Sequence, residues 1–250
     1  MTQTKPILIN ESILEKSGAV DPPRLRRRHI LDLDDFTKEE IEKVLLNTNA
    51  MKEVLKRDIK KVPTLRGKTI VTLFCEPSTR TRMSFEQAGK VLGADVINAS
   101  NGGSSMEKGE SLHNPALTIQ AMNADVIVLR HPHPGTPHLL SRILDSCIIN
   151  AGDGAHAHPS QSLLDIYTIH SHLGTLEGKK IVIVGDIMYS RVARSNLWGL
   201  TKMGAQVTLC TPPTLIPLDF LNGYHSVNGH PFASVQIETN LERALLDADV

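Results

Sequence analysis

Short apolar runs rich in Val and Ile recur along the chain, separated by stretches in which apolar residues return at helical spacing. Runs of this kind, bounded by Gly, Asn and Asp, are typical of β-strands. We predict strands at Thr69–Phe74, Asp95–Asn98, Asp125–Leu129, Cys147–Asn150, Lys180–Val184 and Gln206–Cys210, and a shorter strand–helix unit over residues 234–246.

The stretches between these strands predict helices over residues 79–92, 112–122, 160–172 and 190–203. Ahead of the first strand, Thr37 and Glu40 form a capping box, and Ile41, Val44 and Leu45 follow it at helical spacing. We therefore predict one more helix that begins near Thr37.

The alternation of such strands with helices is typical of parallel α/β sheets. We predict an α/β fold with two doubly wound parallel-sheet domains, the second incomplete in this chain. Residues 1–28 are predicted to form an N-terminal arm, residues 29–173 the first domain and residues 174–250 the second. Asp249 and Val250 resemble the first residues of a further strand, so we expect the chain to be a fragment.

The composition narrows the classes of function. Of the 250 residues, 27 are Lys or Arg and 27 are Asp or Glu, so the formal net charge is zero. Proteins that bind nucleic acid by neutralising phosphates carry an excess of Lys and Arg, and aromatic residues, which could stack on bases, make up only 4%. We expect no nucleic acid as a partner and interpret the basic segment Arg24–Arg28 as a solvated surface.

No apolar run approaches the length of about 20 residues that a membrane-spanning helix needs. The N-terminus also lacks the apolar core of a secretory signal. Cys75, Cys147 and Cys210 are widely spaced and form no Cys-x-x-Cys pair, which favours a reducing compartment. We therefore expect a cytoplasmic protein with no membrane partner.

The densest group of polar residues follows the first predicted strand. In open parallel sheets, ligands bind beyond the carboxyl ends of the strands. Ser78, Thr79, Arg80, Thr81 and Arg82 stand there, where a helix is predicted to begin. Hydroxyls, free N–H groups of a first helical turn and bidentate guanidinium groups all recognise phosphate. The sequence therefore predicts a phosphate site at this junction.

Other strand ends carry further candidates. Arg130 ends the third strand, and His158 and Gln161 flank the start of the helix that follows the fourth. After the fifth strand, Gly185 stands alone where a dinucleotide fingerprint needs three glycines, which disfavours NAD binding. Arg191, in the next helical turn, is a candidate for holding an anion.

Three His-x-His pairs invite a metal-hydrolase interpretation. No carboxylate-rich ligand set accompanies them, so we predict no metal site. The pairs are His131 with His133, His156 with His158, and His170 with His172.

Several of these segments match the motifs of one family, in its order and at its spacing. Residues 76–86 resemble the carbamoyl-phosphate signature of aspartate carbamoyltransferase catalytic chains, and residues 104–111, 130–132, 158–165 and 185–195 resemble its later motifs. The resemblance covers about residues 28–250. The related ornithine carbamoyltransferases carry a His-Cys-Leu-Pro motif that this chain lacks.

The resemblance implies transfer of a carbamoyl group from carbamoyl phosphate to L-aspartate, giving N-carbamoyl-L-aspartate and phosphate in pyrimidine biosynthesis, without a metal or organic cofactor. By matched position, the implied ligands of carbamoyl phosphate are Ser78, Thr79, Arg80, Thr81, Arg130, His158 and Gln161, joined by Ser104 and Lys108 of the neighbouring subunit. Among these, Arg80, Thr81, Arg130 and His158 are the implied catalytic residues, and Arg191 would hold a carboxylate of aspartate.

The family also implies a homotrimer with shared active sites, in which a regulatory chain or a dihydroorotase can be a further partner. Ser160 stands where many relatives have Thr, and the second aspartate-binding motif, Arg-x-Gln, does not occur in this sequence. Two alternatives therefore stay open: a carbamoyltransferase for another amino acid such as ornithine, and a non-catalytic scaffold subunit.

Overall fold

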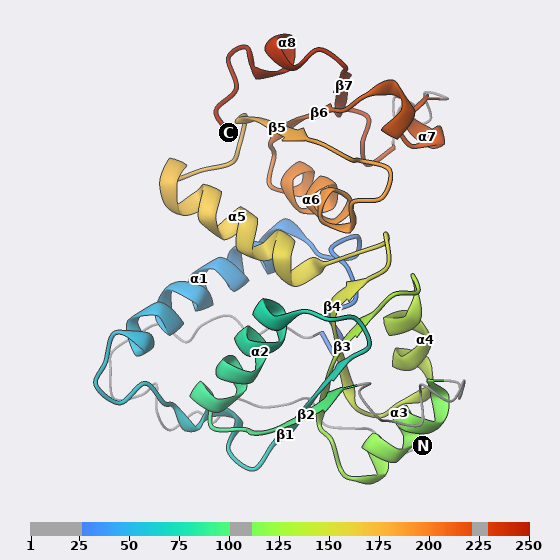
Figure 1. Ribbon diagram of the computed structural model, residues 1–250. Coiled ribbons are helices and arrows are strands. Elements are labelled where there is room, and N and C mark those ends of the chain that lie inside the picture. Colours follow the sequence, from blue (N-terminus) through green and yellow to red (C-terminus); the bar gives the residue numbers. More distant parts are fainter. Residues whose placement is uncertain (1–26, 101–111, 222–229) are drawn as a thin grey trace. The chain divides into compact units, whose positions relative to one another are not determined.

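The computed structural model describes residues 27–100, 112–221 and 230–250 (Figure 1). Contacts between Cα atoms divide these residues into two compact units. The first unit holds the described residues up to Leu31 together with Glu42–Ala151, and the second holds Asp32–Ile41 together with Gly152–Val250.

The first unit is built on a four-stranded sheet. Its strands are β1 (Thr69–Phe74), β2 (Asp95–Ser100), β3 (Val126–His131) and β4 (Cys147–Asp153), in the order β2-β1-β3-β4. β1 pairs in parallel with both β2 and β3. All four predicted strands are confirmed, and β4 runs on past its predicted end at Asn150.

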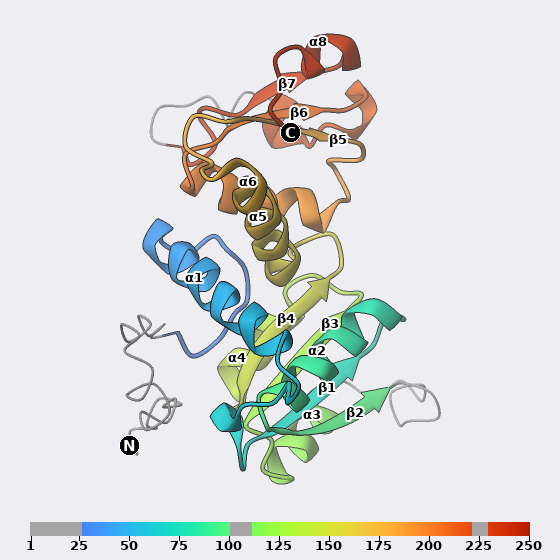
Figure 2. The ribbon, with the colours of Figure 1, turned by 90° about the vertical axis from the view of Figure 1, so that its left-hand side faces the viewer.

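Both faces of this sheet are covered, which confirms the doubly wound arrangement for this unit (Figure 2). On one face, Val71 and Leu73 pack in a buried cluster with Ala116 of α3 (His113–Ala121) and Leu140 of α4 (Thr136–Ile143). On the other face, Ile70 and Phe74 form a second cluster, against which Phe85 of α2 (Thr79–Val91) packs. Successive side chains of β1 thus alternate between two cores.

The capping box predicted at Thr37 is confirmed. The Thr37 hydroxyl accepts a hydrogen bond from the Glu40 backbone N–H (3.2 Å), and Glu40 Oε2 accepts one from the Thr37 N–H (3.0 Å). The helix α1 (Lys38–Leu55) begins directly after it. A short 3-10 helix, η2 (Pro63–Leu65), leads from α1 towards β1.

The second unit contains a three-stranded parallel sheet in the order β5-β6-β7, formed by β5 (Lys180–Val184), β6 (Gln206–Cys210) and β7 (Gln236–Glu238). Its helices are α5 (Pro159–Leu173), α6 (Arg191–Lys202), α7 (Leu218–Leu221) and α8 (Leu241–Leu245), with the 3-10 helix η4 (Pro213–Leu215). At the edge of the sheet, Asp249 N–H donates to Lys180 O (2.9 Å) and Val182 N–H donates to Val250 O (2.9 Å). Asp249 and Val250 therefore lie beside β5.

A glycine allows α5 and α6 to approach closely within this unit. A Cβ added to Gly199 would lie 2.5 Å from Ile166 Cδ1 and 3.0 Å from Ser162 Oγ, both on α5. Contacts therefore group α5 with the second sheet. The domain boundary at residue 173 stays a prediction.

The helix α4 was not predicted. In the part of the chain that the structure describes, no helix is both long and apolar enough to cross a membrane.

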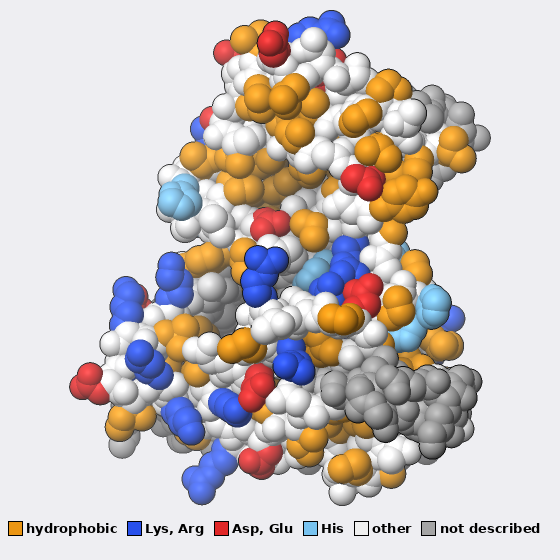
Figure 3. All heavy atoms as spheres, in the orientation of Figure 1, with side chains coloured by type: hydrophobic (Ala, Val, Ile, Leu, Met, Phe, Trp, Pro, Cys, Tyr) orange, Lys and Arg blue, Asp and Glu red, His pale blue; other side chains and the backbone are white. Residues whose placement is uncertain are grey.

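On the face drawn in Figure 3, Lys and Arg side chains stand over α1 and α2, with Asp and Glu side chains among them.

Candidate active site

The junction of β1 and α2 presents the first turn of a helix at a strand end. Ser78 is the N-cap residue of α2, with an extended backbone (φ −159°, ψ 96°), and its side chain makes no capping hydrogen bond. Thr79 and Arg80 are exposed in the first turn, and Thr81 is half-buried. The Ser78 side chain therefore does not use the backbone N–H groups of this turn, and free N–H groups at the start of a helix are suited to binding an anion.

Arg130 belongs to the same edge of the first sheet. It is the register partner of Phe74, the last residue of β1, and its carbonyl accepts a hydrogen bond from the Cys75 N–H (2.8 Å). Arg130 Nε lies 3.1 Å from Glu76 Oε2, and Arg130 Nη1 donates to the Ala151 carbonyl (3.3 Å). Its side chain is only 14% exposed, so these contacts fix the guanidinium at the strand end.

His158 caps α5 in the second unit and is buried. Its backbone N–H donates to the Ser195 hydroxyl (2.9 Å), and that hydroxyl donates to Asp32 Oδ1 (2.9 Å). Burial is the largest influence on Asp32 and raises the pKa of its carboxyl, while hydrogen bonds from Leu33 N–H and Ser195 act in the opposite direction. A chain of hydrogen bonds thus links Asp32 to the backbone of His158.

Gln161 lies in the first turn of α5, where the sequence placed it. Its Nε2 donates to Asp165 Oδ1 (2.9 Å), one turn further along the helix. Asn196 Nδ2 on α6 donates to the other oxygen of the same carboxylate (2.8 Å). The Ser160 hydroxyl, between the two candidates, is 3.4 Å from His158 Nδ1.

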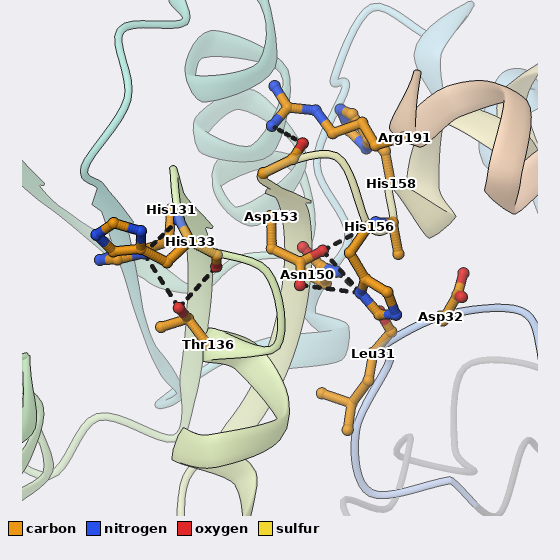
Figure 4. A network of polar contacts seen from close by, with 12 residues as sticks. Leu31, Asp32, His131, His133, Thr136, Asn150, Asp153, His156, His158 and Arg191 are labelled. Carbon is orange, nitrogen blue, oxygen red and sulfur yellow. Dashed lines mark hydrogen bonds and ion pairs between the residues drawn. The ribbon is translucent and has the colours of Figure 1, made fainter. Parts of the chain in front are cut away.

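Arg191 is the first residue of α6 and follows its N-cap, Ser190, whose hydroxyl accepts from the Ala193 N–H (3.2 Å). Arg191 Nη1 donates to the Gly154 carbonyl (3.1 Å), as Figure 4 shows. The side chain is therefore directed towards the loop between β4 and α5, the loop that also leads to His158.

Two histidines of the His-x-His pairs take part in local structure. His156 Nδ1 faces the fully buried Asp153 carboxylate at 3.0 Å (Figure 4), and this hydrogen bond, with the charge of Asp153, raises the pKa of His156 against the effect of burial. His131 Nδ1 accepts from the His133 N–H (3.0 Å) and contacts the Thr136 hydroxyl (3.1 Å). Within residues 27–100, 112–221 and 230–250, no group of three or more His, Cys, Asp or Glu could hold a metal ion.

The candidate residues therefore fall into two sets, one in each unit. The first unit brings Ser78, Thr79, Arg80 and Thr81 to the sheet edge at which Arg130 is the next-to-last residue of β3, and the second unit carries His158, Gln161 and Arg191 at helix starts. Ser104 and Lys108 lie outside the described residues. Sequence reasoning assigned no role to Asp32, Asp165, Ser195 or Asn196. Asp165 and Ser195 are the last residues of the matched segments 158–165 and 185–195, whereas Asp32 and Asn196 lie outside them.

Comparison with known proteins identifies the family. Residues 28–171 match the model of the aspartate/ornithine carbamoyltransferase family's carbamoyl-phosphate binding domain. The chain is 56% identical over 227 residues to the aspartate carbamoyltransferase catalytic subunit of Roseiflexus sp. (strain RS-1), covering 91% of this chain and 70% of that protein. It is 54% identical to the subunit of the same name from Chloroflexus aggregans, covering 90% of this chain and 71% of that one.

Solved structures agree. The chain resembles the aspartate transcarbamoylase of Trypanosoma cruzi in complex with aspartate and phosphate, with a TM-score of 0.78, 30% identity, and coverage of 88% of this chain and 73% of that one. It also resembles the catalytic subunit of M. jannaschii aspartate transcarbamoylase, with a TM-score of 0.75, 37% identity, and coverage of 89% and 72%. The chain belongs to the aspartate/ornithine carbamoyltransferase family.

Proposed function

We propose that this chain is a catalytic chain of an aspartate carbamoyltransferase, which transfers the carbamoyl group of carbamoyl phosphate to the amine of L-aspartate. The observation that carries the proposal is the first turn of α2, which the Ser78 side chain does not cap, with Ser78–Thr81 at the sheet edge where Arg130 pairs with the last residue of β1. The names of the relatives support aspartate, rather than ornithine, as the acceptor.

The residues of the first unit suit the phosphate end of the substrate. Carbamoyl phosphate carries a phosphate dianion, which the N–H groups of the first turn of α2 and the Arg80 guanidinium would bind with charge-assisted hydrogen bonds. Lys108 of a neighbouring subunit would add a second cation. These groups also stabilise the phosphate as it leaves, because its negative charge grows in the transition state.

The reaction itself needs no protein nucleophile. The aspartate amine forms a bond to the carbonyl carbon, the bond from that carbon to the phosphate oxygen breaks, and the leaving phosphate takes the proton that the amine loses. Negative charge develops on the carbonyl oxygen, where Thr81, Arg130 and His158 would act as hydrogen-bond donors. Gln161 would accept from the carbamoyl NH₂, and Arg191 would hold a carboxylate of aspartate. Because both substrates are anions, positioning and charge neutralisation would supply most of the rate enhancement.

Calorimetry with carbamoyl phosphate tests the phosphate site. Arg80→Ala should weaken binding on the order of ten- to a hundredfold, as expected for the loss of a charge-assisted hydrogen bond. Lys90→Ala is the matched control, because it removes a cation from the last turn of the same helix. Equal affinity of wild type and Arg80→Ala would refute the site. Formation of N-carbamoyl-L-aspartate by the same sample tests the activity, whereas binding without turnover would favour a non-catalytic subunit.

We further infer a homotrimer whose sites borrow Ser104 and Lys108 from the adjacent chain. Arg80→Ala and Lys108→Ala chains, each nearly inactive alone, should regain activity when they are mixed and reassembled, because some sites then escape both substitutions. Verified mixed trimers that stay inactive would contradict the shared site.

A further inference from the structure

The carboxylate of Asp165 lies between two side-chain amides. Gln161 Nε2 donates to Oδ1 (2.9 Å) from the same helix, and Asn196 Nδ2 donates to Oδ2 (2.8 Å) from α6. All three residues belong to the second unit. We propose that Asp165 is a positioning residue that orients the Gln161 carboxamide so that Oε1 accepts from the NH₂ of carbamoyl phosphate and selects it over acyl phosphates. This inference rests on the proposed function.

The chemistry of the pair fixes the direction of the amide. An ionised carboxylate has only acceptors, so a neighbouring amide must present its NH₂ to it. Rotation of the Gln161 carboxamide by half a turn would instead bring Oε1 against Asp165 Oδ1. With Nε2 committed to Asp165, Oε1 is directed away from that carboxylate and is available as an acceptor.

Asn196 shows how strongly this carboxylate orients an amide. Asn196 is only 8% exposed, and its Oδ1 is buried without a hydrogen-bond partner among the described residues. A buried acceptor without a partner is costly. The Nδ2 of Asn196 nevertheless faces Asp165, because the charge-assisted bond outweighs that cost.

A simpler interpretation is that Gln161 and Asp165 form an ordinary pair four residues apart on a helix, of the kind that stabilises helices slightly. The contact from Asn196 distinguishes the two interpretations. Because a second helix holds the other carboxylate oxygen, Asp165 is fixed between α5 and α6 rather than free on a helix surface.

The proposal predicts a preference for one acyl group. Acetyl phosphate has a methyl group where carbamoyl phosphate has NH₂, and the two share the phosphate and the carbonyl. Gln161 Oε1 can accept a hydrogen bond from the NH₂ group of carbamoyl phosphate, whereas the methyl group of acetyl phosphate has no hydrogen to donate to it. The ratio of the acetyl phosphate Kd to the carbamoyl phosphate Kd therefore reports the orientation of this amide, while the Kd of inorganic phosphate reports the rest of the site.

Calorimetry on the full chain would measure these three affinities for wild type, Gln161→Ala, Asp165→Ala and the double variant. Asp165→Ala should lower the ratio by about three- to tenfold, the value of one neutral hydrogen bond. Gln161→Ala should do the same, the double variant should lose no more than either, and phosphate affinity should stay unchanged.

The swapped pair Asp165→Asn with Asn196→Asp is the rescue control. This double variant exchanges the carboxylate and the amide between the two helices. The carboxylate at position 196 then accepts from the NH₂ of the amide at position 165. The oxygen of that amide therefore again faces Gln161 Nε2 and accepts its hydrogen bond. The ratio should return to the wild-type value. If Asp165→Ala does not fold, Asp165→Ser, whose hydroxyl is too short to hold Gln161, provides the same comparison.

Three outcomes would contradict the proposal, and they distinguish the role of Asp165 from that of Gln161. A ratio that falls in Gln161→Ala but stays at the wild-type value in Asp165→Ala would overturn the role of Asp165 alone. A ratio that does not change in Gln161→Ala would overturn the proposed role of Gln161, and the role of Asp165 with it. Equal losses of all three affinities in Asp165→Ala would show a structural role and would also overturn the proposal.

Discussion

The Ser195 hydroxyl lies 2.9 Å from the backbone nitrogen of His158 and accepts its hydrogen bond, while donating to Asp32. A serine in the second turn of α6 therefore holds the residue that caps α5, which is the candidate donor to the carbonyl oxygen. His158 is buried, so no solvent molecule readily replaces this acceptor.

Ser195→Ala should therefore destabilise the protein and lower its activity. The variant leaves the His158 N–H and the Asp32 carboxylate without the hydroxyl, and an unsatisfied buried group costs about 1–3 kcal/mol. Urea unfolding measures the loss of stability, and turnover measures the displacement of His158. Ser171→Ala, which removes an exposed hydroxyl from the last turn of α5, is the control. A Ser195→Ala protein with wild-type stability would show that this hydrogen bond contributes nothing.

The raised pKa of Asp32 makes a prediction about pH. Burial makes the native state hold the Asp32 proton more tightly than the unfolded chain does, so this group favours folding most below its ordinary pKa of 3.8. Its contribution is lost as the pH rises from that value through the raised native pKa. Asp32→Asn keeps an oxygen that can accept from Leu33 and Ser195 and has no charge to bury.

The free energy of unfolding of Asp32→Asn relative to wild type should therefore increase as the pH rises through this window. Denaturant titrations at a series of pH values would measure it. Asp58→Asn, at an exposed position of the first unit, should show no such increase. A difference between Asp32→Asn and wild type that is constant with pH would contradict the effect of burial.

His156 titrates in a higher window. Its hydrogen bond to Asp153 raises its native pKa above the ordinary 6.5, and Asp32 and Asp34 act in the same direction. The stabilisation is complete below the unfolded pKa and is lost as the pH rises through the native value. His156→Asn should flatten the fall in stability above pH 6.5, and His172→Asn, on the exposed end of α5, should retain it. Equal slopes in wild type and His156→Asn would show that this pair does not stabilise the fold.

The strands of the first sheet were predictable because runs such as β1 and β3 are short, rich in Val, Ile and Leu, and buried along most of their length, as strands covered on both faces are. The helix α4 was missed because Pro132, Pro134 and Pro137 surround Gly135 and suggest a loop. Gly135 is in fact the N-cap residue, with φ 78°, and Pro137 lies in the first turn, where a missing N–H costs nothing.

The candidate site was predictable where its residues follow strands directly. Arg80 lies in the helix that follows β1, and Arg130 is the next-to-last residue of the neighbouring strand β3, so the topology of a parallel sheet brings them to one edge. The residues that hold the site were not predictable in this way. Asp32 and Ser195 are far apart in sequence, and their hydrogen bond depends on how the loop before α1 packs on α6, which no local pattern encodes.

Lys202 holds the loop before α1 in place. Its ammonium group donates to the carbonyls of Leu33 (2.7 Å), Asp34 (2.6 Å) and Phe36 (2.7 Å). A lysine at the end of α6 thus fixes the segment that carries Asp32, and Ser195 lies two turns earlier on the same helix. In the sequence, this lysine is indistinguishable from a solvated one.

Gly199, between Ser195 and Lys202, provides the last test of this arrangement. Alanine in the middle of a helix is normally more favourable than glycine by about 0.5–1 kcal/mol. At this position, however, the added Cβ would meet Ile166 Cδ1 at 2.5 Å and Leu33 Cδ1 at 3.0 Å. Gly199→Ala should therefore destabilise the protein by about 1–3 kcal/mol, the usual cost of overpacking.

The double variant Gly199→Ala with Ile166→Val separates packing from helix propensity. Valine lacks the Cδ1 atom that the new methyl would meet, so the double variant should be more stable than the sum of the two single changes predicts. Urea unfolding of the four proteins gives this coupling energy. Strict additivity would mean that Ile166 does not limit the approach of α5 to α6, and a more stable Gly199→Ala protein would mean that helix propensity outweighs packing at this crossing.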